Sequence, residues 1–593
     1  MDTNKKIALL RKKMAAQNIA ALVVPSGDPH QSEYMADFWQ ARQWLTGFTG
    51  SAGTAVVTRD AAILWTDFRY WIQAASQIGP SAFELFKQGE PGVPEFETWL
   101  SQTLSSGDII AMDGKIVSAA NVKKYKKVFT DKRMTLATTD VDFIADIWTD
   151  RPPMPASRAW MLSDTYTGKT RGEKLDQIRS AMVNTGANTH LMTTLDDIAW
   201  TFNLRGKDVR NTPVNLAFAL VTLDRAILFI NPSKVDKRLV SAFEQDKIEL
   251  LAYTRVEEIL GSLGQETRIR LDPDFVGVAF YQAVDPKARI IEKINPATEL
   301  KAVKNETEIN HVRQTAIKDG VAMVNFLHWI ENRTDSAQVS EMSVAKTLFE
   351  FRKQQPDFYT NSFDPIMAYG EHSAMCHYSA TPQSDVPLKH EGMFLTDSGG
   401  NYLTGTTDIT RTLNLGTPSK QEIKDYTLVL KGHICVATAL FPEGTKGFQI
   451  DTLARQFLWK EGMTFGHGTG HGVGFFLCVH EGPARISPFP IDVELNEGML
   501  LTNEPGLYRE GRYGIRLENM ILVVKDRKTE FGQFMRFENM TLCHFETSMV
   551  DRELLCQEEI DYFNTYHQQV YERLSPVLDP QVAAWLKKKT API

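Results

Sequence analysis

The chain has 593 residues, of which 43% are hydrophobic and 23% charged, and this length predicts three or four globular domains. Its formal net charge is −8, with acidic and basic residues interspersed, so nucleic acid is not the expected partner because phosphate binding requires a basic face. No segment approaches the roughly 18 consecutive apolar residues that cross a bilayer, so we expect no membrane contact.

Residues 5–17 predict an amphipathic surface helix, because charged residues interrupt the apolar pattern and the apolar core of a secretory signal is missing. The five cysteines are few for this length and lack CxxC spacing. We therefore expect a reduced, cytoplasmic setting. The cysteines are Cys376, Cys435, Cys478, Cys543 and Cys556.

One order of elements occurs twice in the first half of the chain: a basic helix, an apolar strand, a tryptophan-containing segment and a second apolar strand. The first series covers residues 5–17, 20–24, 44–47 and 62–65, and the second covers 174–184, 189–192, 200–203 and 226–230. The repetition indicates two α/β domains of one type in tandem. The alternative is a chance recurrence of common patterns.

Two segments indicate domain boundaries. The proline-rich segment 151–155 cannot lie inside a helix or a central strand, so we expect a linker there. The second boundary lies near residue 303, because Asn305 precedes a charged helix. The predicted domains are 1–152, 153–303 and 304–593.

The third predicted domain begins with helices over 306–332 and 340–355 and continues as short strands. Its C-terminal segment, 550–589, has the spacing of an amphipathic helix. The apolar stripe of this helix, which we expect to pack on the core, consists of Tyr562, Tyr566, Val570, Leu574 and Trp585.

Two aspartates lie in a predicted β-hairpin of this domain. The apolar strand 393–396 ends at Asp397, a Gly-Gly-Asn turn follows, and the return strand covers 406–412. Such a hairpin brings Asp397 and Asp408 side by side, with Asp408 on the same strand face as Thr410. The arrangement suits a bridged pair of metal ions, and the alternative is two turn aspartates without a metal.

His467 and His471 lie among glycines at every second position from 466 to 474. Their spacing is that of a helical zinc motif, but each glycine costs a helix interior about 1 kcal/mol. We therefore expect extended or turning backbone that approaches another group closely. Two histidines in such a segment indicate a functional role.

Two more acids follow apolar strands. Glu504 comes after the apolar run 498–501, and Glu518 lies in strand 513–522 on the same face as Arg516. An acid in so apolar a strand needs a partner. That partner is either a cation or, for Glu518 alone, Arg516 in a buried ion pair.

The four carboxylates of Asp397, Asp408, Glu504 and Glu518, gathered around the imidazole of His471, would repel one another in one buried site. Two divalent cations carry the four positive charges that balance them. The residues therefore predict a two-metal hydrolytic centre.

These motifs resemble the metallopeptidase family that includes methionine aminopeptidase, prolidase and aminopeptidase P. Segments 28–34, 47–55 and 65–70 extend the resemblance to the long form of aminopeptidase P, which has two related domains before the catalytic one. The resemblance implies an α/β (α+β) fold, with two tandem creatinase-N-like α/β domains followed by a pita-bread catalytic domain.

The resemblance also implies a role for each ligand. Asp397 and Asp408 would bind one metal ion, and Asp408 would also bind the second. His471 and Glu504 would complete the protein ligands of the second ion, and Glu518 would bridge both.

Substrate and transition-state contacts are implied for His377, His467 and His480, and Arg516 is a further candidate for substrate binding. Creatinase shares the fold but lacks the ligand set, so the intact ligands argue against that activity. His372 departs from the family, in which asparagine is frequent, and its effect is left open.

The implied reaction removes the N-terminal residue from peptides with proline in the second position. Two cations about 3.5–4 Å apart lower the pKa of a shared water to ~7, so a metal-bridging hydroxide would attack while Glu504 shuttles the proton. His467 or His480 would stabilise the oxyanion. The oxygen-rich ligands favour Mn²⁺, although Co²⁺ or Zn²⁺ also fit. The alternatives are a prolidase acting on Xaa-Pro dipeptides and a non-catalytic peptide-binding protein. A homodimer is implied by the resemblance alone.

Overall fold

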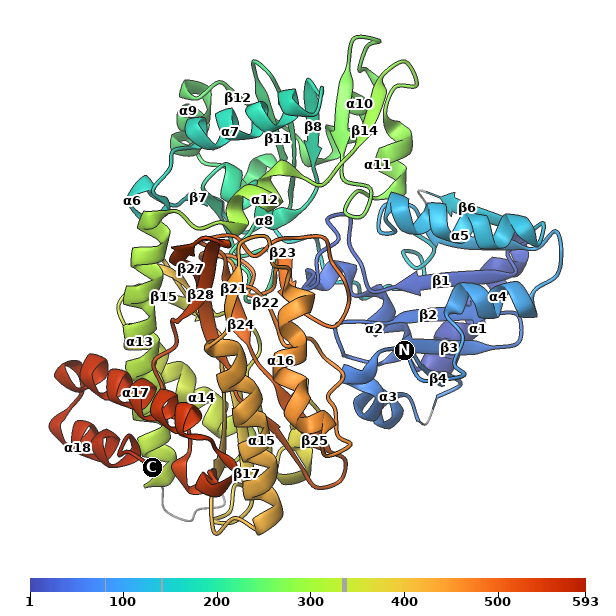
Figure 1. Ribbon diagram of the computed structural model, residues 1–593. Coiled ribbons are helices and arrows are strands. Elements are labelled where there is room, and N and C mark those ends of the chain that lie inside the picture. The colour runs from blue at the N-terminus through green and yellow to red at the C-terminus, as the bar shows by residue number, and fades with distance from the viewer. Residues whose placement is uncertain (80, 140–141, 333–338) are drawn as a thin grey trace. The chain divides into compact units, whose positions relative to one another are not determined.

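The computed structural model describes residues 1–79, 81–139, 142–332 and 339–593, which form two compact units (Figure 1). Unit 1 comprises Met1–Leu162 and Lys169–Thr298, and unit 2 comprises Ser163–Gly168 and Glu299–Ile593. Helices and strands are mixed in both units, as the α/β prediction requires. In the described ranges, no helix has the length and apolar character of a membrane span.

Unit 1 contains two six-stranded sheets with the same topology, β4-β3-β2-β1-β5-β6 and β12-β11-β10-β8-β13-β14. In each sheet, three antiparallel strands are flanked by parallel strands on both sides. The first sheet consists of β1 (Ala21–Pro25), β2 (Thr54–Thr58), β3 (Ala62–Thr66), β4 (Glu84–Lys87), β5 (Ile109–Asp113) and β6 (Thr135–Thr139). The second consists of β8 (Thr189–Met192), β10 (Ala217–Thr222), β11 (Ala226–Ile230), β12 (Ile248–Leu251), β13 (Arg268–Leu271) and β14 (Arg289–Glu292). The prediction of two domains of one type is therefore confirmed.

The helices of unit 1 cover both faces of these sheets. Strand β1 shows why both faces are apolar, because Leu22 and Val24 enter one hydrophobic cluster and Ala21 and Val23 another. The helices are α1 (Thr3–Ala16), α2 (Ala41–Thr46), α3 (Trp71–Ile78), α4 (Phe96–Thr103), α5 (Ala119–Asp131), α7 (Arg171–Asn184), α8 (Leu195–Thr201), α9 (Lys237–Gln245), α10 (Val256–Gly261) and α11 (Val278–Ala283). Two short strands, β7 (Trp160–Met161) and β9 (Leu204–Arg205), pair with each other. Helix α1 is the predicted amphipathic helix, and residues 151–155 have no regular structure, as expected for a linker.

Unit 2 combines long helices with several small sheets. Asn305 caps α13 in a capping box with Glu308, which explains where this helix begins. The helices are α6 (Asp164–Thr167), α13 (Glu306–Glu331), α14 (Glu341–Lys353), α15 (Lys420–Ala437), α16 (Gly447–Trp459), α17 (Gln557–Leu574) and α18 (Pro580–Lys589), and α12 (Pro296–Ala302) leads into the unit. Helices α15 and α16 pack against the six-stranded sheet β21-β28-β27-β24-β22-β23 (Figure 1).

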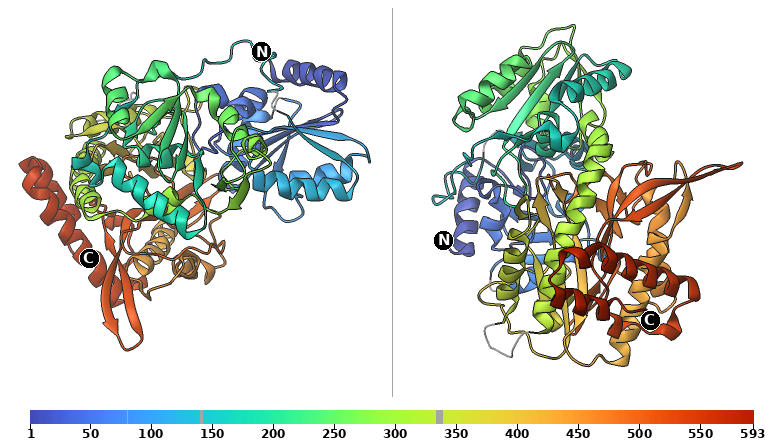
Figure 2. Two further views of the ribbon diagram at one scale, coloured as in Figure 1. Left: turned by 90° about the horizontal axis from the view of Figure 1, so that it is seen from above. Right: turned by 90° about the vertical axis from the view of Figure 1, so that its left-hand side faces the viewer.

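The six-stranded sheet carries a long hairpin, β27–β28, which extends beyond the other strands in both views of Figure 2. Its strands are β21 (Leu440–Pro442), β22 (Gly470–Gly472), β23 (Glu481–Ile486), β24 (Leu500–Asn503), β27 (Asn519–Thr529) and β28 (Gly532–Asn539). The smaller sheets are formed by β15 (Phe358–Asn361), β18 (Gly400–Tyr402) and β19 (Gly405–Thr406); by β16 (Ile366–Tyr369), β17 (Met393–Ser398) and β20 (Ile409–Asn414); and by β25 (Gly506–Arg509) and β26 (Tyr513–Arg516).

The predicted Gly-Gly-Asn turn after Asp397 is wrong. Gly400 and Asn401 belong to β18, which pairs with β15 on one side and with β19 on the other. The chain therefore makes a second hairpin, β18–β19, before it returns in β20 beside β17. The pairing partner β15 is distant in sequence, so the local pattern carried no sign of it.

The predicted C-terminal helix is two helices. Pro580 begins α18, because proline suits the first turn of a helix and not its interior. Tyr566, Val570 and Leu574 of α17 are buried in the core of unit 2, with Tyr562 and Trp585 packed against it. The stripe therefore has the predicted packing role, and Figure 2 shows α17 and α18 side by side.

Candidate functional site

Four of the predicted ligands lie together in unit 2. Asp408, His471 and Glu518 each offer a ligand atom within 4.8 Å of the others. Nε2 of His471 lies 3.4 Å from Oδ2 of Asp408 and 3.6 Å from Oε1 of Glu504. Oε2 of Glu518 accepts a hydrogen bond of 2.7 Å from the Thr410 hydroxyl. Three carboxylates and one imidazole therefore surround a space suited to a cation.

Strand pairing explains why these acids meet. Asn503 lies opposite Asn519 in the antiparallel pair β24–β27, so Glu504 and Glu518 both lie just beyond the same end of that pair. Asp397 lies opposite Thr410 in the pair β17–β20. Alternation then puts Asp397 on the face that also carries Asp408.

The glycines beside His471 allow its strand to fit between two others. A Cβ at Gly470 would lie 2.0 Å from the carbonyl oxygen of Thr502, and a Cβ at Gly472 would lie 2.2 Å from that of Glu481. Both distances are too short for any side chain, so only glycine is accommodated. The predicted extended backbone is confirmed, because these residues form β22.

Asp397 has a different partner from the other acids. Nη2 of Arg516 donates to its Oδ2, and among the described residues its Oδ1 has no hydrogen-bond partner. Arg516 also donates to the Tyr508 hydroxyl (2.6 Å) and the Thr410 hydroxyl (3.2 Å). The ion pair that the sequence left open for Arg516 is thus made with Asp397, and Glu518 stays available to a cation.

The electrostatics of the cluster indicate a need for positive charge. Burial raises the pKa of Asp397, Glu504 and Glu518, and repulsion among the acids raises it further. Burial alone would lower the pKa of His471, but its hydrogen bond to Asp408 and the charge of Glu504 raise it to about 9. Each of these shifts favours a bound proton, which a cation would replace.

The donor set fits divalent metal ions. Nδ1 of His471 is hydrogen-bonded to the Gly472 carbonyl at 2.9 Å, which leaves Nε2 as the ligand atom. Carboxylate oxygens with one imidazole are typical of Mn²⁺ and similar ions. The orphaned Oδ1 of buried Asp397 is a further ligand atom without a protein partner.

Two predicted substrate contacts flank the cluster. Nε2 of His467 is hydrogen-bonded to the Tyr508 hydroxyl at 2.8 Å. The ring of His480 packs edge-on against the ring of His471, with centroids 4.3 Å apart. Both histidines therefore lie at the edge of the ligand group.

The third predicted contact, His377, lies half-buried in the turn after the 3₁₀ helix η5 (Gly370–Ala374), which packs against β17 and β26. Buried Glu341 holds this turn, since its carboxylate accepts hydrogen bonds from His372 Nδ1 (2.9 Å) and the Tyr378 hydroxyl (2.8 Å). His372, whose effect the sequence left open, thus anchors the turn through Glu341.

A buried ion pair on α16 holds the loop before β22. Arg455 donates to the carbonyl oxygens of Phe465 (2.6 Å) and His467 (2.7 Å), and it pairs with Asp451 at 2.6 Å. The Thr469 hydroxyl also donates to Asp451 (2.7 Å). Sequence reasoning missed this pair, although charges four residues apart on the apolar face of a helix were a usable signal.

Tyr508 and Glu341 were also missed by sequence reasoning. Tyr508 lies four residues after Glu504. In an extended chain, residues at even spacing lie on the same face, so this spacing was a usable signal for Tyr508. Glu341 follows directly after the N-cap of α14, where an acid needs no special explanation. No sequence signal distinguishes it.

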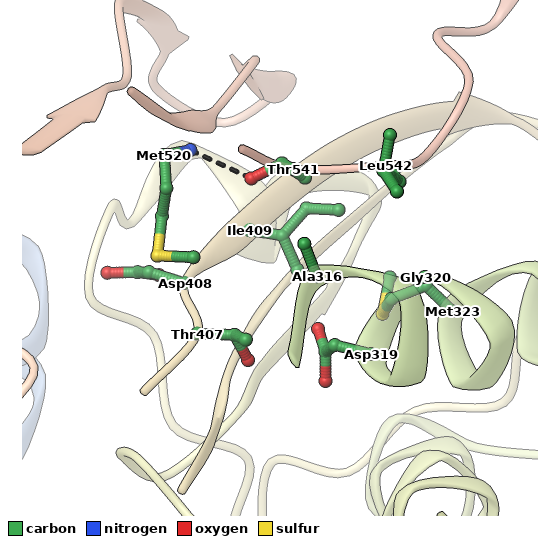
Figure 3. A pocket seen from close by; sticks show the side chains of 10 residues that line it. All are labelled: Ala316, Asp319, Gly320, Met323, Thr407, Asp408, Ile409, Met520, Thr541 and Leu542. Atoms are coloured by element: carbon green, nitrogen blue, oxygen red, sulfur yellow. Dashed lines mark hydrogen bonds between the residues drawn. The ribbon is translucent and has the colours of Figure 1, made fainter. Parts of the chain in front are cut away.

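A small cavity lies between α13 and residues 407–409, and its lining includes Asp408 (Figure 3). In Figure 3 the Asp408 carboxylate points away from α13, whereas Asp319 projects from that helix. Asp319 accepts hydrogen bonds from Arg352 (2.8 Å) and the Tyr402 hydroxyl (2.9 Å). The cavity is therefore a packing feature behind the ligands.

Four family models match consecutive parts of the chain. Residues 6–144 and 150–308 match two models described as the Creatinase/Prolidase N-terminal domain. Residues 310–525 match metallopeptidase family M24, and residues 533–593 match the C-terminal region of peptidase M24. The predicted order of two creatinase-N-like domains and a pita-bread domain is confirmed.

Curated relatives match over the whole length. A "Probable Xaa-Pro aminopeptidase P" of Coprinopsis cinerea is 37% identical, with 100% of this chain and 99% of the relative covered. "Xaa-Pro aminopeptidase 1" of Dictyostelium discoideum is also 37% identical, with 100% and 96% covered.

Solved structures show the same fold. An X-prolyl aminopeptidase of Caenorhabditis elegans, described as a cytosolic enzyme with a di-nuclear active site, is 32% identical with a TM-score of 0.95 and 100% of both chains covered. A Xaa-Pro dipeptidase of Bacillus anthracis is 26% identical with a TM-score of 0.50, and it covers 64% of this chain and 99% of its own.

Proposed function

We propose that this protein hydrolyses the first peptide bond of substrates with proline in the second position. The chain belongs to the Xaa-Pro aminopeptidases of metallopeptidase family M24. The observation that carries the proposal is the group formed by Asp408, His471, Glu504 and Glu518 in a chain that aligns end to end with such enzymes. A non-catalytic peptide-binding protein would not need this complete ligand set.

We assign the ligands as follows. Asp397 and Asp408 would hold one divalent cation, Asp408, His471 and Glu504 would hold the second, and Glu518 would serve both. The cluster of four ligands and the orphaned Oδ1 of Asp397 support this assignment. When bound, the two cations, for which we propose Mn²⁺, supply the Lewis acidity that lowers the pKa of a water from 15.7 toward ~7.

The protein groups then have distinct roles. Glu504 accepts the proton of the attacking water on its carboxylate and returns it to the leaving nitrogen. His377, His467 and His480 contact the substrate and stabilise the oxyanion. Arg516 contributes a fixed positive charge beside Asp397.

The length of the chain favours an aminopeptidase over a dipeptidase. The dipeptidase structure accounts for 64% of the chain, whereas the aminopeptidase structure accounts for all of it. The proposal includes domains at 1–152, 153–303 and 304–593 and a cytosolic location, for which the description of the Caenorhabditis elegans relative is the support. It also includes a homodimer, which light scattering would test.

A peptide panel tests the function. Purified protein is equilibrated with Mn²⁺, its metal content is measured, and it is incubated with Xaa-Pro-Yaa, with Xaa-Ala-Yaa and with the dipeptide Xaa-Pro. We expect release of Xaa from Xaa-Pro-Yaa alone and its loss with a chelator. Cleavage of the dipeptide alone would establish a prolidase, and cleavage of neither proline peptide would refute the proposal.

A further inference from the structure

A glutamate and two lysines form a buried ionic cluster in unit 2. Nζ of Lys304 donates to Oε1 of Glu481, and Nζ of Lys301 lies 3.5 Å from Oε2 of the same residue. All three side chains are at most 4% exposed. Lys304 also donates to the carbonyl oxygens of Lys301 (3.0 Å) and Ala302 (3.4 Å), so its ammonium is fixed from several sides.

Both lysines belong to the segment with which the chain enters unit 2 at Glu299. Val303, which lies between the two lysines in the sequence, forms a β-bridge with Met499, directly before β24. That strand leads to Glu504. The cluster is therefore built into the framework that carries the ligands.

Glu481 is the first residue of β23 and follows His480 directly. Its backbone pairs with Gly472 of β22, beside His471. His480 lies in the bend directly before β23, one peptide bond from Glu481. Anchoring the Glu481 carboxylate therefore restrains the backbone from which the His480 ring reaches that of His471.

The stability of the fold alone does not account for this cluster. Burying three charged groups carries a desolvation penalty, and apolar side chains of similar volume often stabilise a core as well or better. What the cluster does provide is a rigid anchor at one position of the backbone.

We propose that Glu481 is a positioning residue for His480, held in place by Lys304 and Lys301. The inference rests on the proposed function, because it concerns the substrate contact made by His480. It adds that the entry segment of unit 2 sets the position of that contact.

A double-mutant cycle tests the proposal. The parent, Glu481→Gln, His480→Ala and the double variant are compared by kcat/KM on Xaa-Pro-Yaa, with metal content measured for each. We expect Glu481→Gln to lower kcat/KM about 10- to 100-fold at parental metal content, as is typical for residues that orient a site. In the His480→Ala background it should cause no further loss beyond about twofold.

The same fold loss in both backgrounds would show that Glu481 does not act through His480. A Glu481→Gln variant within about twofold of the parent would also overturn the proposal. Lys304→Met removes the ammonium that donates to Glu481. It should give the same pattern of kcat/KM losses in the two backgrounds, so the test remains valid if Glu481→Gln folds poorly. Asp208→Asn, in the buried Lys234–Asp208 pair of unit 1, is the matched control that should cost stability without changing kcat/KM.

A crystal structure of metal-loaded Glu481→Gln tests the positioning without any activity. We expect the His480 ring to leave its place beside His471. An unmoved ring would overturn the proposal. If the parent itself failed to cleave the peptides, the proposed function would fall, and this structure would still decide whether Glu481 positions His480.

Discussion

Removal of the Arg455 guanidinium should damage the site through the backbone of its histidine loop. Arg455 lies on α16 and touches none of the ligands, but it holds the carbonyl oxygens of Phe465 and His467. In Arg455→Met these oxygens lose their charged donor, and Asp451, which is 2% exposed, becomes a buried carboxylate without its counter-ion.

The magnitude follows from these contacts. Removing one partner of a buried ion pair costs about 3–5 kcal/mol. At an unfolding entropy of about 2.1 cal/mol/K per residue, each kcal/mol lowers the melting temperature of a domain of about 300 residues by roughly 1.6 °C, so we expect a decrease of about 5–8 °C for unit 2. The second substitution Asp451→Asn removes the unpaired charge and keeps an acceptor for the Thr469 hydroxyl. The double variant should therefore melt higher than Arg455→Met alone.

Thermal unfolding followed by circular dichroism, with the protein saturated in Mn²⁺, measures the melting temperatures of the parent, Arg455→Met and the double variant. Kinetics provide the second readout, because neither variant restores the anchors of the loop. We expect kcat/KM to remain low in the double variant even where stability recovers. A double variant that melts lower than Arg455→Met, by the sum of the single effects, would refute the reasoning.

Three further predictions concern single residues. Asp408→Asn should abolish turnover and lower the metal content, and elemental analysis that found parental content would show that Asp408 is not a ligand. His467→Ala should retain both metals and slow turnover, so metal content and kcat are measured on the same sample. The hydrogen bond to Glu341 raises the pKa of His372, so this pair stabilises the protein below about pH 6.5 and loses its effect as the pH rises through the raised pKa. His372→Asn should therefore lower the melting temperature more at pH 5 than at pH 9, and equal losses would contradict the assignment.

The ligands could be proposed from sequence because each carries a local signal. Glu504 and Glu518 lie at the ends of apolar strands, and His471 has a glycine on either side. Acids and glycines are costly in such positions unless something requires them. The two N-terminal domains were predictable for a related reason, since a repeated order of elements is visible without knowing any contact.

Features that depend on strand pairing were not accessible in the same way. The turn after Asp397 was misread because β18 pairs with β15, and no residue of the hairpin itself reveals that partner. The same holds for Glu481 and Lys304, which meet across 177 residues of sequence. Local patterns identify groups that need a partner, but the register of distant segments decides which partner they receive.

Arg516 shows how one such pairing changes the electrostatics of the site. Counting acids alone, two divalent cations would balance the four carboxylates. Arg516, however, is bound to Asp397 inside the same buried region, and its guanidinium stays charged there because neighbouring negative groups outweigh the cost of its burial and raise its pKa. With both cations bound, the site would therefore hold one more positive than negative charge. A surplus of this sign favours an anion at the centre, which is what a hydrolytic site needs if its nucleophile is to form near neutral pH.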